Sequence, residues 1–90
     1  MLTIWKYPIP IQDKFILSVP KGARVLAVQT QYGEPMIWML VDPTVEKCDM
    51  RFTLVGTGHS VPADKYIGTF QFMGGNLVFH LFVESSDGQG

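Results

Sequence analysis

Short apolar runs alternate along this chain with turns rich in Gly, Pro and Asp. Within most runs, apolar and polar residues alternate with a period of two, which is typical of half-buried β-strands. No window of about ten residues shows the periodicity of an amphipathic helix. The expected strands cover residues 2–7, 14–19, 24–31, 36–42, 50–55, 66–72 and 77–84. The sequence therefore predicts an all-β fold of about seven antiparallel strands, forming a small sandwich or barrel with little or no helix.

Turn residues and side-chain alternation add local detail to this prediction. Tyr32-Gly33-Glu34-Pro35 predicts a β-hairpin because Gly33 accepts a positive φ, and Gly74-Gly75-Asn76 predicts a second tight turn. Residues 43–48 are expected to form a polar loop that contains Cys48, and residues 63–65 could close one helical turn. Strict alternation places three side chains on one face of each of two strands: Leu26, Val28 and Thr30, and Tyr66, Phe70 and Phe72.

Two expected strands, 36–42 and 77–84, are apolar on both faces, although a half-solvated antiparallel sheet needs one polar face. One interpretation is that these are the central strands of a closed barrel, whose other face meets a loop or a helix. The other is that one face forms a contact between copies of the chain, because large exposed apolar patches usually mark interfaces. We favour the second interpretation and expect a homo-oligomer. The candidate interface residues are Met36, Trp38, Met39, Leu40, Phe79 and Phe82.

Length and charge limit the partners that the protein can have. Residues 1–84 are expected to form a single all-β domain, and the small polar residues 85–90 a flexible C-terminal tail. The formal net charge is −1, which disfavours nucleic acid or an anionic membrane as a partner. The longest apolar run, 36–41, is far shorter than a membrane span, and the N-terminus lacks the pattern of a secretion signal. The expected location is therefore the cytoplasm.

The residues that could carry catalysis or bind a metal are few and scattered. The single cysteine, Cys48, excludes an intramolecular disulfide, and with His59 and His80 it matches no known metal-ligand spacing. Ser60 follows His59 directly, and adjacent residues usually point apart, so a nucleophile–base pair is not indicated. A lone histidine on an apolar face, such as His80, is typical of a hydrogen-bonded core or interface residue. The sequence thus predicts no enzymatic activity, no metal site and no cofactor.

The segment Gly56-Thr57-Gly58-His59 is the strongest candidate for a ligand site. Its two glycines allow backbone N–H groups to approach an anion closely, and Thr57 and His59 add side-chain partners. It is not a P-loop, because no Lys-Ser or Lys-Thr follows and no helical pattern begins after it. Arg24 and Arg51 occupy outward strand positions and could flank the same ligand. The alternative is an ordinary loop with a tight bend and two solvated arginines.

Five segments together resemble a known family: IWKYPIPIQDKF, VPKGARVLAVQTQYGEPMIWMLVD, GTGH, YIGTFQF and GGNLVFHLF. As an ordered set that spans most of residues 3–84, they resemble small proteins of unknown function that bacteriophages and prophages encode. The resemblance transfers no catalytic residues to this chain. It implies a phage accessory protein in the cytoplasm of a bacterial host, and small phage accessory proteins often antagonise host defences.

The leading hypothesis from sequence is a non-enzymatic, self-associating binding module of phage origin that counters a bacterial defence. Such a module would sequester a small anionic signal such as a nucleotide, or block a host defence protein. The alternative hypothesis is a structural or assembly accessory protein of the phage particle.

Overall fold

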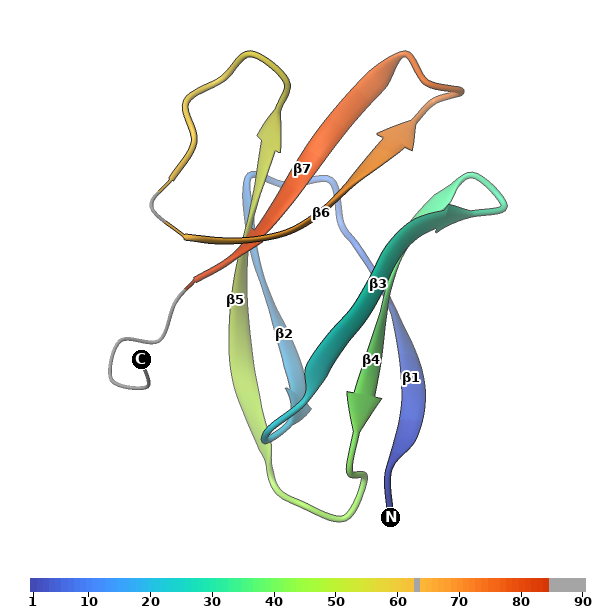
Figure 1. The fold of residues 1–90 in the computed structure, drawn as a ribbon, viewed down its shortest axis with the longest axis vertical. Coiled ribbons are helices and arrows are strands. Elements are labelled where there is room, and N and C mark those ends of the chain that lie inside the picture. Colours follow the sequence, from blue (N-terminus) through green and yellow to red (C-terminus); the bar gives the residue numbers. More distant parts are fainter. Residues whose placement is uncertain (63, 85–90) are drawn as a thin grey trace.

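The structure, a computed structural model, describes residues 1–62 and 64–84. These residues form seven strands and no helix (Figure 1). The strands are β1 (Thr3–Pro8), β2 (Lys14–Pro20), β3 (Arg24–Gln31), β4 (Glu34–Val41), β5 (Lys47–Gly56), β6 (Lys65–Phe72) and β7 (Leu77–Val83). The prediction of an all-β fold is confirmed. The predicted tail, residues 85–90, and the middle of the connection from β5 to β6, residue 63, lie outside the described residues.

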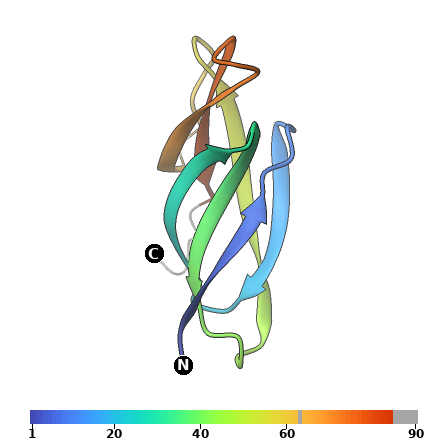
Figure 2. The same cartoon turned by 90° about the vertical axis from the view of Figure 1, so that its right-hand side faces the viewer.

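The strands form two antiparallel sheets that pack as a sandwich. Sheet A has the strand order β1-β4-β3, and sheet B has the order β2-β5-β7-β6. β1, β3 and β4 lie on the right of the molecule in Figure 1 and β2 and β5 on its left, and Figure 2 shows sheet A in front of sheet B. Of the two predicted architectures, the structure therefore has the sandwich, because the two sheets do not join into a closed barrel.

The core fills the space between the sheets and is built from alternate residues of each strand. On β4, Ile37, Met39 and Val41 have no exposed surface. On sheet B, the rings of Phe15 and Phe52 stack with their centroids 5.1 Å apart, at directly paired positions of β2 and β5. Aromatic and aliphatic side chains of this kind dominate the free energy of a small core.

The predicted hairpin is confirmed, with a turn shorter than the predicted residues 32–35. Tyr32 and Gly33 alone connect β3 to β4, and both have a positive φ, 52° for Tyr32 and 80° for Gly33. Two positive φ values in a two-residue loop define a type I′ turn, whose twist matches that of the strands it joins.

Each of two strands, β3 and β6, contains a β-bulge that sequence alternation did not predict. The pairing shifts between Val25 and Ala27 on β3, and between Tyr66 and Gly68 on β6. A bulge adds one residue to a strand, so the side chains before it change face. Tyr66 consequently lies on the outer face, opposite Phe82, and the prediction that it shares a face with Phe70 is wrong. For the same reason Val25 packs on the core, and Leu26 does not.

The predicted polar loop at 43–48 is shorter than expected. β5 begins at Lys47, so Cys48 lies in a strand, paired with Val19 of β2 and exposed at the end of the sheet. The early start of β5 follows from its pairing with β2, which runs without interruption from Lys14–Thr53 to Pro20–Lys47. Cross-strand hydrogen bonds therefore extend the strand into a polar sequence.

Sheets A and B meet along one edge, where β3 and β6 lie next to each other. The hydroxyl of Thr30 donates a hydrogen bond of 2.7 Å to the carbonyl oxygen of Gln71. At Gly68, a Cβ atom would lie only 3.2 Å from the Cβ of Val28. The absence of a side chain at Gly68 therefore allows the two edge strands to approach each other closely.

Residues 57–62, the first part of the connection from β5 to β6, lie beside the outer face of sheet B. Several of them border a hollow together with Val55 of β5 and with His80 and Phe82 of β7. Under this connection, the outward side chains of Val55 and Phe82 are each only 7% exposed. The interpretation of a closed barrel is therefore wrong, although the outward Phe82 of β7 does lie beside a loop.

Candidate ligand-binding site

The predicted site segment, Gly56 to His59, forms a tight turn at the end of β5. The N–H of Thr57 donates to the carbonyl oxygen of Val78 at 3.3 Å, and the N–H of His59 donates to that of Gly56 at 3.1 Å. Gly58 has a φ of 93°, a conformation that side chains with a Cβ rarely adopt. The segment is therefore fixed to β7 at its start and bends sharply at Gly58.

The imidazole of His59 lies against the backbone of Gly56. A Cβ atom built at Gly56 would be 3.4 Å from both Cε1 and Nδ1 of His59. Because glycine has no side chain, the His59 ring can lie directly on the backbone at this position. The His59 side chain in consequence folds back over the end of β5.

A chain of side-chain hydrogen bonds joins the loop to the outer face of β6 and β7. Thr57 Oγ1 lies 2.8 Å from His80 Nε2, and His80 Nδ1 lies 2.9 Å from Thr69 Oγ1. Thr69 Oγ1 in turn lies 2.5 Å from the hydroxyl of Tyr66. Tyr66 reaches this chain only because the bulge in β6 turns it outward. His80 therefore has a hydrogen-bond partner at both ring nitrogens.

These groups border a hollow of about 240 Å³ between the loop and the outer face of sheet B, which we call the loop pocket. The polar side of the loop pocket is made by Thr57, His59, His80 and Tyr66. Its apolar side is made by Val55, Val61 and Phe82, and Tyr66 packs edge-on against Phe82 at 5.6 Å between centroids. The loop pocket is thus mostly apolar, with a few hydrogen-bonding groups at defined positions, as in many small-molecule sites.

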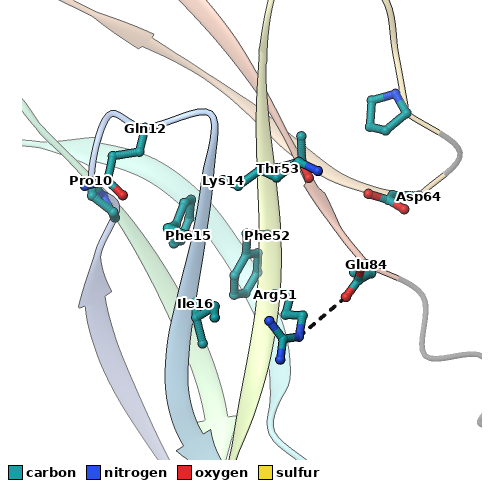
Figure 3. A pocket seen from close by; sticks show the side chains of 11 residues that line it. Pro10, Gln12, Lys14, Phe15, Ile16, Arg51, Phe52, Thr53, Asp64 and Glu84 are labelled. Carbon is teal, nitrogen blue, oxygen red and sulfur yellow. Dashed lines mark ion pairs between the residues drawn. The ribbon is translucent and has the colours of Figure 1, made fainter.

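A second, larger hollow of about 700 Å³, the charged groove, lies on the other side of the loop (Figure 3). Lys14 of β2 and Arg51 of β5 come from outward positions of neighbouring strands, while Asp64 and Glu84 come from the segments flanking β6 and β7. The Nε atom of Arg51 lies 3.7 Å from an oxygen of Glu84. The charged groove therefore carries two positive and two negative side chains.

A third hollow connects the loop pocket with the charged groove. It shares Thr53 and Pro62 with the charged groove, and Val55, His59 and Val61 with the loop pocket. Since Arg51, Thr53 and Val55 follow one another on the outer face of β5, the three hollows form one trough along this strand.

The structure separates some residues that the sequence analysis grouped. Gly56, Thr57, Gly58 and His59 all line the loop pocket, whereas neither candidate arginine does. Arg51 lines the charged groove, and Arg24 lines a separate hollow between β3 and β6 together with Lys65.

The candidate interface residues also divide between different environments. Met36, Trp38 and Leu40 face outward from β4 and are half-buried. Met39 lies in the core, Phe79 packs against the core, and Phe82 lies under the loop. Of the six, only the three outward residues of β4 thus lie together on an outer sheet face.

Two residues that line the trough, Lys14 and Tyr66, were not identified from sequence. Lys14 gave no signal beyond its outward position at the start of a strand. Strict alternation placed Tyr66 on the face of Phe70, opposite to that of Thr69, so the contact between Tyr66 and Thr69 could not be anticipated. Only the bulge brings them together, and a Gly68 within the strand was the one sequence feature that could have indicated it.

The described residues contain no group of three or more His, Cys, Asp or Glu side chains positioned to hold a metal ion. Over the same part of the chain, no helix has the length and apolar character that crossing a membrane requires.

The protein is thus a small antiparallel β-sandwich with a ligand-sized depression beside one loop. The chain belongs to the family described as Domain of unknown function (DUF7352), which matches residues 1–90. Comparison with curated proteins and with solved structures gave no match.

Proposed function

We propose that this protein is a non-enzymatic binding module that sequesters a small anionic molecule, such as a nucleotide, in the trough on sheet B. The observation that carries the proposal is the charged groove, which Lys14 and Arg51 line together with Pro62 at the end of the loop. Its volume of about 700 Å³ lies within the range of about 300–1,000 Å³ that is typical of small-molecule sites.

The pairing of Arg51 with Glu84 is compatible with anion binding. The two side chains are 56% and 58% exposed, and their closest contact is 3.7 Å. An exposed ion pair with this geometry contributes little free energy. A phosphate can form a forked, charge-assisted pair of hydrogen bonds with the guanidinium, which is a stronger interaction. We therefore expect a phosphorylated ligand to displace Glu84 from Arg51.

The biological setting of the proposal comes from the resemblance to phage-encoded proteins. We place the protein in the cytoplasm of a bacterial host, where sequestering a nucleotide signal would counter a defence that depends on that signal. A binding protein suffices for this role, because removing a signal requires affinity and no turnover.

Calorimetric titration tests the proposal with a panel of mononucleotides, cyclic nucleotides and nucleotides of the ADP-ribose type. We expect at least one to bind, and Arg51→Met to weaken its binding about 10- to 100-fold, because a hydrogen bond to a charged group is lost. Arg24→Met is the matched control, since Arg24 lines a different hollow, and should leave affinity unchanged. If no nucleotide in the panel binds, sequestration is wrong.

A second candidate function, blocking a host protein or joining a phage particle, is favoured by the outer face of sheet A. Ile4 and Leu26 there are 55% and 48% exposed, beside the half-buried Trp38 of β4. An apolar sheet face of this kind suits contact with another protein. Co-purification of the protein with phage particles would support the assembly role.

A further inference from the structure

We infer that the loop pocket holds a flat, hydrogen-bonding ring of the ligand, as a nucleobase would provide, while the charged groove holds its anionic end. This inference rests on the proposed function and assigns the two parts of the trough to two parts of one molecule. Three observations carry the inference: the side chains that wall the loop pocket, the distance between the loop pocket and Arg51, and the hydrogen-bond chain that ends at Tyr66.

The walls of the loop pocket suit a flat ring. Four aromatic or imidazole side chains line it, from the loop, β6 and β7: His59, His80, Tyr66 and Phe82. Rings of this kind stack on nucleobases without regard to base identity. At about 240 Å³, the loop pocket is below the usual range of about 300–1,000 Å³ for a whole drug-sized ligand. It therefore suits one ring system, with the rest of the ligand extending outside.

The charged groove lies at a suitable distance for that extension. Arg51 and Val55 are four residues apart on β5, which corresponds to about 14 Å along a strand. This length is comparable to that of a mononucleotide with an extended phosphate group. The connecting hollow, bordered by Thr53 and Val61, lies between the two ends.

The hydrogen-bond chain allows Tyr66 to act as either a donor or an acceptor toward the ring. In one direction, Tyr66 donates to Thr69, Thr69 donates to His80 Nδ1, and His80 Nε2–H donates to Thr57. Thr57 then donates to the carbonyl oxygen of Val78, 3.4 Å away.

In the opposite direction, Thr57 donates to His80 Nε2, and Nδ1–H donates to Thr69, which donates to the phenol oxygen of Tyr66. Both directions give a partner to both ring nitrogens of neutral histidine and to the hydroxyl hydrogens of Thr57 and Thr69. In the first the phenol oxygen can only accept a bond from the ligand, and in the second its O–H is free to donate one. The site can therefore match either a donor or an acceptor on the ring edge.

Nuclear magnetic resonance titrations with adenosine, which lacks phosphate, and with pyrophosphate, which lacks a ring, separate the two subsites. Adenosine should shift the signals of His59, His80 and Tyr66, and pyrophosphate should shift those of Arg51 and Lys14. Thr69→Val breaks the chain at its centre while keeping the side-chain shape, so it should weaken adenosine binding about 2- to 12-fold, the effect of one neutral hydrogen bond. It should leave pyrophosphate binding unchanged. Thr3→Val, on β1 of the other sheet, is the matched control.

Tyr66→Phe provides a second variant if Thr69→Val fails to fold, because it removes one hydroxyl and retains the ring packed against Phe82. Binding of pyrophosphate without adenosine, or adenosine binding that neither variant weakens, overturns this inference and leaves the proposed function standing. Failure of adenosine, pyrophosphate and the whole nucleotide panel to bind overturns both.

Discussion

At the scale of single residues, Asp42 shows how one side chain ends a strand. It follows β4 directly, and its carboxylate accepts hydrogen bonds from the hydroxyl and the N–H of Thr44, at 2.6 and 3.0 Å. The hydroxyl bond and then the N–H bond hold the pKa of Asp42 below its ordinary value. Such bonds to the charged form are typical of an Asx-type turn.

Thr44→Ala should raise the pKa of Asp42 toward its ordinary value, because the stronger of the two bonds is lost. A carboxyl whose pKa is depressed by folding stabilises the native state above its unfolded-state pKa, and this contribution is lost as pH falls through the folded-state pKa. The variant should therefore lose less stability on acidification than the parent does. Titration of the Asp42 carboxyl by nuclear magnetic resonance, with Thr44→Ser as the control that keeps the hydroxyl, measures the shift. An unchanged pKa in Thr44→Ala would contradict this account.

Tyr7 presents the opposite case, a polar atom in an apolar setting. Its hydroxyl oxygen is buried and has no hydrogen-bond partner within the described residues, and burial raises the pKa of the phenol. Tyr7→Phe should therefore leave the free energy of unfolding unchanged or raise it by up to about 1 kcal/mol, since an unsatisfied group is removed.

The effect of pH on Tyr7 has a definite sign. Because folding raises its pKa, the contribution of Tyr7 to stability is complete below pH of about 10 and is lost as pH rises toward the folded-state pKa. The Phe variant should thus become the more stable protein at alkaline pH, as measured by urea unfolding at several pH values. A loss of more than about 1 kcal/mol at neutral pH would show that the hydroxyl has a partner.

At the scale of elements, the close approach of β3 and β6 depends on Gly68. Because a Cβ there would lie 3.2 Å from Cβ of Val28, Gly68→Ala should destabilise the fold by about 1–3 kcal/mol through overpacking. The backbone itself accepts alanine, since Gly68 is not among the residues with positive φ. Chemical unfolding of Gly68→Ala, Val28→Ala and the double variant forms a cycle. The double variant should be more stable than the sum of the two losses predicts, and strict additivity would exclude the contact.

The same two strands show where sequence patterns were sufficient and where they were not. Apolar runs bounded by turn residues located all seven strands, because each strand buries one face on a common core. Period-two alternation misplaced Tyr66 and Leu26, since a bulge shifts side chains by one position and depends on the neighbouring strand rather than on local sequence. For the site, two glycines drew attention to the loop, and the structure places this loop at the edge of a hollow. The partners of His80 could not be predicted, because they come from strands whose order in the sheet was unknown.

At the scale of the whole molecule, the sandwich is thin, with principal extents of 39 × 31 × 16 Å. With only two layers, each sheet has one face toward the core and one facing outward. The β5–β6 connection covers part of the outer face of sheet B. On sheet A, the outer face presents Ile4, Leu26, Met36, Trp38 and Leu40. On the same face, Lys6 of β1 donates a hydrogen bond across β4 to the side-chain oxygen of Gln31 of β3. The expectation of self-association therefore applies to sheet A.

We predict a homo-oligomer whose contact is centred on the outer face of sheet A. Trp38 lies in the middle of β4, between β1 and β3, so Trp38→Lys places a charge at the centre of the contact. Buried at an interface, such a charge without a partner is costly, and the variant should dissociate to monomers of 10.1 kDa. Analytical ultracentrifugation at micromolar concentration measures the change. Met73→Lys is the matched control, because Met73 is 60% exposed in the turn between β6 and β7, and should sediment as the parent does. If the parent itself sediments as a single species near 10 kDa, the face does not bind a second copy, and a host or phage protein becomes its expected partner.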